Sequence, residues 1–332
     1  HGNDPRFAYY LLGTLDLAHY NSGSAQPSLN RNYIHPIPLA FPSREEQEKI
    51  VELLGSLDDK MELNRRMNET LEAMARAIFK DWFVDFGPTR AKAARRGHPT
   101  EPKFDREPYL APEIWNLFPD TLDDDDKPEG WTISNVANCA TKIQNGGTPR
   151  RSEETYWSAG TVPWLSSGEV RQDMIIDTEK YITELGLQNS SAKMLPEKTI
   201  LVALYGATAG QVAFSTIPLT TNQAVSAVIP REEFRYFLLV HLKREVNNLA
   251  KSAVGSAQQN ISKKIVEDLP VLLPTIDCLR TFDVHVAPLF DRVVANLIEN
   301  RALSKTRDLL LPKLMSGEIR LSDAEKAVEG VL

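Results

Sequence analysis

The chain has 332 residues, of which 42% are hydrophobic, so it can bury one large core or two moderate ones. Its net charge of -7 argues weakly against nucleic-acid binding, because DNA phosphates attract basic domains. Two cysteines far apart in sequence and no apolar run of about 18 residues exclude a disulfide framework and a membrane span, and favour a cytoplasmic location.

Residues 43–86 carry the first long helical pattern, which follows an N-terminal segment, residues 1–42. Pro42-Ser43 gives a start signal and Gly87-Pro88 a stop, so the sequence predicts a helix of roughly 40 residues, on the order of 60 Å long. Its apolar residues fall on heptad positions. One seam position holds Ile50, Leu57, Asn64, Leu71 and Ile78, the next holds Leu53, Met67 and Met74, and flanking positions hold Leu54, Met61 and Ala75.

Residues 87–130 are rich in proline and charge, including the run Asp123–Pro128, and they predict a connector. After residue 130 the residue pattern changes to short runs that favour β-strands, such as residues 199–205 and 223–229, and these runs are broken by Gly, Asn and Pro. Residues 131–274 are therefore expected to form a mixed α/β domain. This segment holds 14 Lys and Arg against 13 Asp and Glu, so the acidity lies outside it.

The loops of this domain offer the polar and basic side chains that DNA contacts require. No phosphate-binding loop, zinc-ligand spacing, nucleophile elbow or amino-methyltransferase motif is present, so we predict no catalytic residue and no metal site. Each loop also fits ordinary turn chemistry. The candidate DNA-binding residues are Gly147, Thr148, Arg150, Arg151, Ser166, Ser167, Asn222, Gln223, Ser256, Gln258, Asn260, Lys263 and Lys264.

A second long helical pattern covers residues 275–318, and residues 319–332 are expected to form a C-terminal tail. Pro288 should kink or split the first turns of this helix, because proline lacks the amide hydrogen that the helix needs. Its seam residues are Leu289, Asn296 and Leu303.

The two helices belong to an internal repeat. Gly23-Ser24-Ala25-Gln26 recurs 232 residues later as Gly255-Ser256-Ala257-Gln258, and the same offset pairs Ile50 with Phe282, Leu57 with Leu289, and Asn64 with Asn296. If the copies are antiparallel around a pseudo-twofold axis, Asn64 and Asn296 lie near that axis and fix the register. The alternative is that both amides face solvent.

Several motifs resemble the specificity subunits of type I restriction-modification systems, and the resemblance covers almost the whole chain. They are Pro-Glu-Gly-Trp at 128–131, Gly-Gly-Thr-Pro at 146–149, the repeated Gly-Ser-Ala-Gln, Glu-Glu-Gln-Glu-Lys-Ile at 45–50, Ala-Ile-Phe-Lys-Asp-Trp-Phe-Val-Asp-Phe at 77–86, and Leu-Pro-Lys-Leu-Met-Ser-Gly-Glu-Ile at 311–319.

The resemblance implies an α+β fold in which target-recognition domains are joined by two long helices that form an antiparallel coiled coil. Each domain would read one half of a split site in double-stranded DNA. The helices would space the domains and dock two methyltransferase subunits, through which endonuclease and motor subunits join. S-adenosylmethionine, ATP and magnesium would then be bound by those partners, and no cofactor by this chain.

In one respect the chain departs from the family pattern. The repeat offset places the start of a first recognition domain about a hundred residues before His1, so residues 1–42 are expected to be the C-terminal remnant of that domain. Three alternatives remain open: a half-size specificity subunit that acts as a homodimer, a helical adaptor that binds only proteins, and a nuclease or methyltransferase in its own right.

Overall fold

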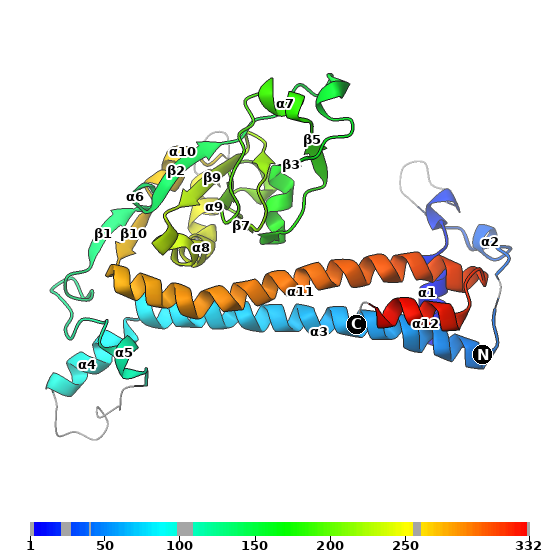
Figure 1. The fold of residues 1–332 in the computed structure, drawn as a ribbon, viewed down its shortest axis with the longest axis horizontal. Coiled ribbons are helices and arrows are strands. Elements are labelled where there is room, and N and C mark those ends of the chain that lie inside the picture. The colour runs from blue at the N-terminus through cyan, green and yellow to red at the C-terminus, as the bar shows by residue number, and fades with distance from the viewer. Residues whose placement is uncertain (1–2, 21–27, 40, 98–108, 255–259, 331–332) are drawn as a thin grey trace. The chain divides into compact units, whose positions relative to one another are not determined.

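The computed structural model describes residues 3–20, 28–39, 41–97, 109–254 and 260–330 (Figure 1). They form two compact units, one of His1–Glu69 with Ala295–Leu332 and the other of Thr70–Val294. The long helices α3 (Arg44–Phe83) and α11 (Ile276–Ser316) each contribute a part to both units. No helix in these described ranges has both the length and the apolar character needed to cross a lipid bilayer.

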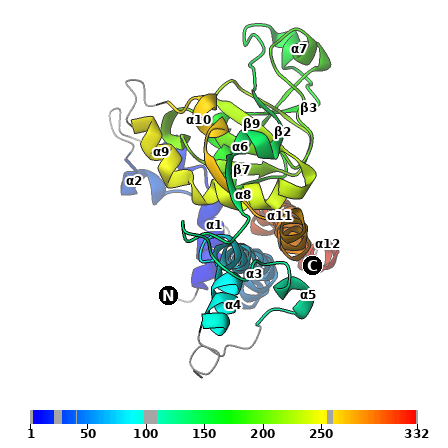
Figure 2. The ribbon, with the colours of Figure 1, turned by 90° about the vertical axis from the view of Figure 1, so that its left-hand side faces the viewer.

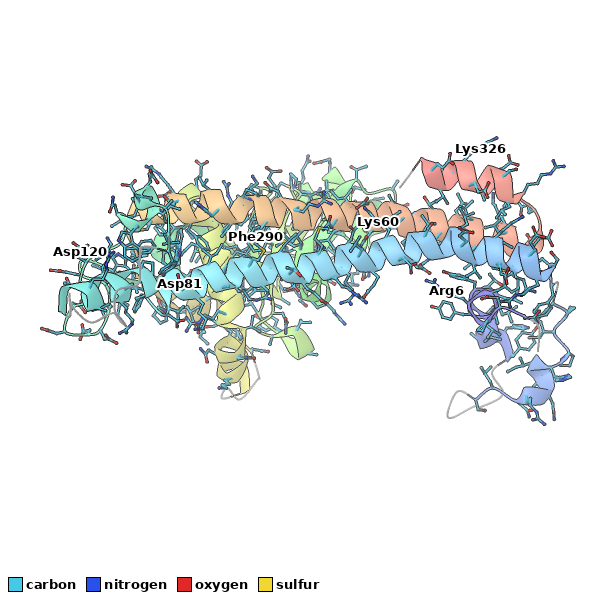
Figure 3. All side chains as sticks on the ribbon, turned by 90° about the horizontal axis from the view of Figure 1, so that it is seen from below. Arg6, Lys60, Asp81, Asp120, Phe290 and Lys326 are labelled. Carbon is cyan, nitrogen blue, oxygen red and sulfur yellow. The ribbon has the colours of Figure 1, made fainter. Side chains whose placement is uncertain are left out.

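The first unit is a small helical bundle. Besides its parts of α3 and α11 it contains α1 (Pro5–Gly13), the 3-10 turn η1 (Leu17–Tyr20), α2 (Arg31–Ile34) and α12 (Leu321–Glu329). Figure 3 shows α1, with Arg6, and α12, with Lys326, on opposite sides of the two long helices. The buried core joins α1, α3, α11 and α12 and consists of Phe7, Tyr10, Leu11, Ile50, Leu54, Leu57, Leu303, Leu310, Leu314, Met315, Ala324 and Val328. The expected C-terminal tail is therefore largely a packed helix.

Within this unit the two long helices run antiparallel along a seam with a polar centre. Asn64 Nδ2 donates to Asn300 Oδ1 at 2.9 Å, and Asn296 Nδ2 donates to Asn68 Oδ1 at 2.7 Å. The repeat offset of 232 converts the first bond into the second, so the pair has the predicted pseudo-twofold symmetry. Asn64 and Asn296 are both fully buried, which contradicts the solvent-facing alternative.

The other predicted seam residues are placed in two groups. Ile50, Leu57 and Leu303 are buried in the first unit, whereas Leu71, Ile78 and Leu289 are half-buried in the second. Of the predicted second seam position, Leu53 packs against the core of the first unit and Met67 is half-buried, but the prediction was wrong for Met74. Met74 is 47% exposed, and the neighbouring column that is buried runs through Leu54, Asn68 and Ala75, because helices packed at a small angle bury positions spaced alternately by four and three residues.

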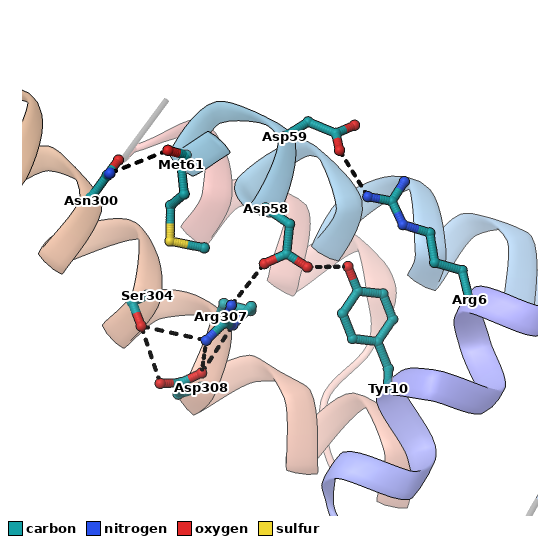
Figure 4. A network of polar contacts seen from close by, with 9 residues as sticks. All are labelled: Arg6, Tyr10, Asp58, Asp59, Met61, Asn300, Ser304, Arg307 and Asp308. Atoms are coloured by element: carbon teal, nitrogen blue, oxygen red, sulfur yellow. Dashed lines mark hydrogen bonds and ion pairs between the residues drawn. The ribbon is translucent and has the colours of Figure 1, made fainter. Parts of the chain in front are cut away.

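A charged network ties α1 to both long helices (Figure 4). Asp58 of α3 accepts a hydrogen bond from Tyr10 Oη at 2.5 Å and pairs with Arg307 of α11 at 2.8 Å. Arg6 of α1 pairs with the exposed Asp59 at 2.8 Å. Burial and the Asp58 carboxylate raise the pKa of Tyr10 above its usual range, so its hydroxyl stays protonated as a hydrogen-bond donor.

Helix boundaries follow local chemistry with two corrections. Ser43 and Glu46 form a capping box at the start of α3, as Ser43 N donates to Glu46 Oε2 at 2.9 Å and Glu46 N to Ser43 Oγ at 3.3 Å. The helix α3 ends at Phe83. Gly87, which was expected to end the helical segment, instead begins α4 (Gly87–Gly97), because proline at the next position suits a first helical turn. The expected connector thus contains α4 and the short α5 (Pro112–Trp115).

The second correction concerns Pro288, which does not split α11, because the helix is continuous over 41 residues. Pro288 lies on the exposed face, and the carbonyl that loses its partner belongs to Val284, which is 70% exposed, so water can reach that side of the helix. The opposite face is buried through Leu279, Phe282, Val286 and Phe290, and this burial offsets the cost of about 3 kcal/mol.

The second unit contains the predicted mixed α/β domain. Its five-stranded sheet has the order β2 (Ala140–Asn145), β9 (Val225–Pro230), β6 (Ile200–Ala203), β7 (Val212–Ser215) and β4 (Met174–Ile175), antiparallel except for β4 with β7. A three-stranded sheet has the order β5 (Lys180–Ile182), β3 (Val162–Leu165) and β8 (Thr220–Thr221). The chain enters through β1 (Thr132–Asn135) and leaves through its antiparallel partner β10 (Pro270–Leu273).

Helical segments complete this unit (Figure 2). They are α6 (Val136–Cys139), α7 (Glu184–Gln188), α8 (Arg235–Arg244), α9 (Val246–Val254), α10 (Lys263–Glu267) and the 3-10 turns η2 (Glu154–Tyr156), η3 (Ser167–Gln172), η4 (Gly206–Thr208) and η5 (Glu232–Phe234). Aromatic rings hold α8 on α3, where the ring of Phe237 lies 5.3 Å from that of Phe79 and 5.0 Å from that of Phe83. The predicted α+β class, with paired long helices and a mixed sheet domain, is confirmed.

Candidate nucleic-acid interface

Loops far apart in sequence meet at one edge of the sheet domain and are bonded to one another through their backbones. Gly147 N donates to Thr221 O at 2.8 Å, Asn222 N to Leu165 O at 3.0 Å, and Leu204 N to the carbonyl of Ala224 at 2.8 Å. The ends of β2, β3 and β6 and the start of β9 therefore form a single loop cluster, residues 145–151, 165–168, 204–208, 221–224 and 260–261. Three of the four predicted contact loops meet here, and Asn260 of the fourth lies beside Ile261, whose N–H donates to Leu204 O at 2.9 Å.

Two glycines make this cluster close-packed. A Cβ on Gly146 would lie 2.1 Å from Thr221 O, and a Cβ on Gly147 would lie 2.4 Å from the backbone carbon of Ser191. Because both obstacles are backbone atoms, they cannot move aside as the end of a flexible side chain would. Gly147 is thus needed for close approach of chain segments, and its expected role in contacting DNA is untested.

Some candidate side chains are already used inside the protein. Ser166 N donates to Glu169 Oε1 at 2.9 Å, and the second oxygen of this buried carboxylate accepts from Glu179 N at 2.9 Å. Asn222 Oδ1 accepts from Ala224 N at 3.1 Å and closes an Asx turn. Ser166 and Asn222 therefore shape the edge, whatever else they contact.

Other candidates face outward. Thr148 Oγ1 donates to Gln223 Oε1 at 2.7 Å, which leaves the amide group of the exposed Gln223 oriented at the edge with its nitrogen as a donor. Ser167 is half-buried, and Arg150 and Arg151 are exposed. A pair consisting of a threonine hydroxyl and a glutamine amide offers the hydrogen-bonding groups that base edges require.

The remaining candidates belong to the segment before β10. Lys263 and Lys264 lie on α10 and pair with Glu267 at 2.9 Å and Asp268 at 2.7 Å, so their charges are partly neutralised. Ser256 and Gln258 lie outside the described residues. The structure therefore gives this group less support as a phosphate contact than the sequence suggested.

The comparisons with known proteins agree with this architecture. The family model for the type I restriction modification DNA specificity domain matches residues 1–73 and 128–291. The chain belongs to this family.

Individual relatives extend the match over almost the whole chain. The type I restriction enzyme HindI specificity subunit of Haemophilus influenzae is 29% identical, over 95% of this chain and 77% of its own length. The MjaIX specificity subunit of Methanocaldococcus jannaschii is 26% identical, over 96% and 69%. The crystal structure of the type I restriction-modification system S subunit from M. genitalium covers 95% of this chain and 73% of its own, with a TM-score of 0.57 and 16% identity, which shows a shared fold.

In this type I specificity protein, sequence reasoning missed several side chains at the loop edge. Tyr205 follows β6 and is 38% exposed, although it is an aromatic residue beside a buried strand. It precedes Gly206, whose φ of 73° is left-handed. An aromatic residue followed by glycine after a strand was the available signal. Trp157 and Lys180, which line a hollow together with Arg151, were not predicted because neither lies in a loop that looks basic.

Proposed function

We propose that this chain is the non-catalytic, sequence-reading component of a type I restriction-modification complex. The observation that carries the proposal is the loop cluster of the 131–274 domain, in a chain that belongs to the DNA specificity family. Its loops are fixed by backbone hydrogen bonds to strands, and a rigid scaffold that presents polar loops is what sequence-specific recognition requires.

The helices have a separate role in this proposal. They space the reading domains and dock two methyltransferase subunits, and the endonuclease and motor subunits join through those. S-adenosylmethionine, ATP and magnesium are bound by the partner subunits, so the adenine methylation and the ATP-dependent cleavage take place outside this chain. The buried asparagine contacts support a spacer of fixed register, because a one-residue slip would leave buried amides without partners.

The decisive experiment is long-read sequencing of adenine methylation in cells that carry the cognate methyltransferase subunit, with and without this gene. A split, non-palindromic motif that appears only with the gene is the expected result. A palindromic motif would instead favour the half-size homodimer. No new methylation, with both proteins present as a complex, would contradict the proposal.

A pair of matched variants tests which part of the domain reads DNA. Thr148→Ala is expected to relax or change the methylated motif, because it releases the Gln223 amide at the loop edge. Thr141→Ala is the control, since Thr141 Oγ1 also makes one hydrogen bond, at 3.0 Å to Ile229 O, but lies at the far end of β2. The same change in motif in both variants would contradict reading by the loop cluster.

The spacer role has its own test. A heptad inserted in α3 between Leu57 and Asn64, with a second inserted opposite it in α11 between Asn300 and Arg307, keeps the seam in phase. It lengthens the helical pair by about 10 Å. The expected result is a gap in the target site that is longer by about 3 base pairs, with unchanged half-site sequences. A changed half-site would contradict the division of roles.

A further inference from the structure

An open hollow beside the loop cluster is lined by two cations and two aromatic rings. It has a volume of about 370 Å³, and its lining residues are Arg151, Trp157, Lys180 and Tyr181. No carboxylate is among them. Two positive side chains that line one hollow, with no carboxylate in its lining, favour an anionic group as the occupant.

Two tryptophans hold Arg151 in place. Its guanidinium carbon lies 5.9 Å from the centre of the Trp157 ring and 5.8 Å from that of Trp164. The two indoles pack edge to face with centroids 5.1 Å apart. Stacking on aromatic faces restricts the guanidinium while leaving the side chain exposed, so little entropy is lost when it binds an anion.

The same tryptophans also fix the backbone that carries Arg151. Trp157 Nε1 donates to Arg150 O at 3.2 Å, and Trp164 Nε1 donates to Gly147 O at 3.0 Å. Both anchored carbonyls lie in the loop cluster and precede Arg151, so they fix the segment of chain that leads into this residue.

Lys180 is supplied by the neighbouring strand. β5 pairs antiparallel with β3, and Lys180 lies opposite Trp164 in that ladder. The next residue, Tyr181, is held by a hydrogen bond from its hydroxyl to Asp177. Within the part of the chain that the structure describes, neither Arg151 nor Lys180 forms an ion pair with a carboxylate, so both charges are available to a ligand.

We propose that Arg151 and Lys180 together bind one backbone phosphate of the DNA duplex, and that this contact positions the loop cluster without reading sequence. The inference rests on the proposed function and adds the class of group that this site contacts. A phosphate is favoured over a base because the hollow holds an arginine and a lysine together, and lysine binds phosphate as a point charge.

The test measures DNA binding by the complex of this chain with its methyltransferase subunit, by fluorescence anisotropy at 50 to 200 mM salt. One duplex carries the methylated motif and the other a scrambled sequence. In the double variant Arg151→Ala/Lys180→Ala, loss of one phosphate contact should lower the salt dependence, the slope of log K against log salt, by about 0.9. The affinity lost at 50 mM should exceed that lost at 200 mM by about 3.5-fold, equally for both duplexes.

The double variant Arg151→Lys/Lys180→Arg is the matched control, because it keeps both charges. It should retain the salt dependence of the unaltered complex, and the methylated motif should stay the same in both variants. An unchanged slope in the alanine variant, or a loss confined to the motif duplex, would overturn the phosphate assignment. If the unaltered complex binds both duplexes equally, the proposed function fails, whatever the variants show.

Discussion

Replacing Asn296 with leucine is expected to destabilise the helical pair, although leucine fits a buried seam. Asn296 donates its amide proton to Asn68 Oδ1 at 2.7 Å, and both side chains are buried. In Asn296→Leu the Asn68 Oδ1 atom loses this donor, which should lower the free energy of unfolding by about 1–3 kcal/mol. Changing both Asn68 and Asn296 to leucine removes donor and acceptor together, and this double variant should be nearly as stable as the unaltered chain.

The equivalent change on the other side of the axis should cost more. Asn64 Nδ2 donates to Asn300 at 2.9 Å and also to the carboxylate of Glu299 at 2.7 Å. The position equivalent to Glu299 in the first helix is Met67, so the Asn296 side has no such charged bond. Hydrogen bonds to charged groups are the stronger kind, and Asn64→Leu should therefore cost about 2–4 kcal/mol.

Urea unfolding followed by circular dichroism at 222 nm measures these differences, with the three variants and the unaltered chain at the same protein concentration. The expected order of the free energies of unfolding places Asn64→Leu lowest, Asn296→Leu next, and the double leucine variant close to the unaltered chain. If Asn296→Leu alone is as stable as the unaltered chain, or if Asn64→Leu is the milder change, the argument from buried hydrogen bonds is refuted.

Three further predictions concern the second unit. Gly147→Ala should destabilise the sheet domain by about 1–3 kcal/mol in thermal unfolding, because its Cβ would lie 2.4 Å from the backbone of Ser191. Gly168→Ala should be neutral, because no atom lies nearer than 3.5 Å to the added Cβ. Equal effects of the two substitutions would contradict the packing argument. Burial lowers the pKa of His241, so the unfolded chain takes up a proton near pH 6.5 while the folded chain does not. The free energy of unfolding should therefore be at its full value above pH 6.5 and should fall as the pH decreases below it. His241→Gln should flatten that decrease in urea unfolding, the exposed His285→Gln should leave it, and an unchanged pH profile in His241→Gln would count against the assignment. Burial also raises the pKa of Cys139 to about 11, so iodoacetamide at pH 8 should label this thiol in urea but only slowly in the folded protein, as followed by mass spectrometry; rapid native labelling would contradict its burial.

The two copies of the repeat show how one backbone arrangement accepts different chemistry. Sequence similarity aligns Tyr10 of α1 with Phe237 of α8. In the first unit Tyr10 bonds to Asp58, whereas in the second Phe237 packs on Phe79 and Phe83. The alignment pairs these two residues, but only the structure shows that one junction with α3 is polar and the other aromatic.

Periodicity and repetition in the sequence determined the helical part of this protein. The offset of 232 residues and the heptads through Ile50, Leu57 and Leu303 predicted two long paired helices with asparagines near their middle, because helical periodicity is a local property of the chain. Their antiparallel orientation was implied by the family resemblance. The burial of Asn64 and Asn296, which the sequence left open, depended on the opposite helix and was decided by the tertiary structure.

Only the tertiary structure decided how the loops come together. β2 pairs with β9 and β3 with β8, so Gly147 meets Thr221 and Leu165 meets Asn222 across more than fifty residues of intervening chain. Strand order is not encoded in any local pattern, because it depends on which apolar faces can be buried together. For the same reason, Lys180 and Arg151 line one hollow only because β5 pairs with β3. In the sequence each residue looks like an ordinary surface cation.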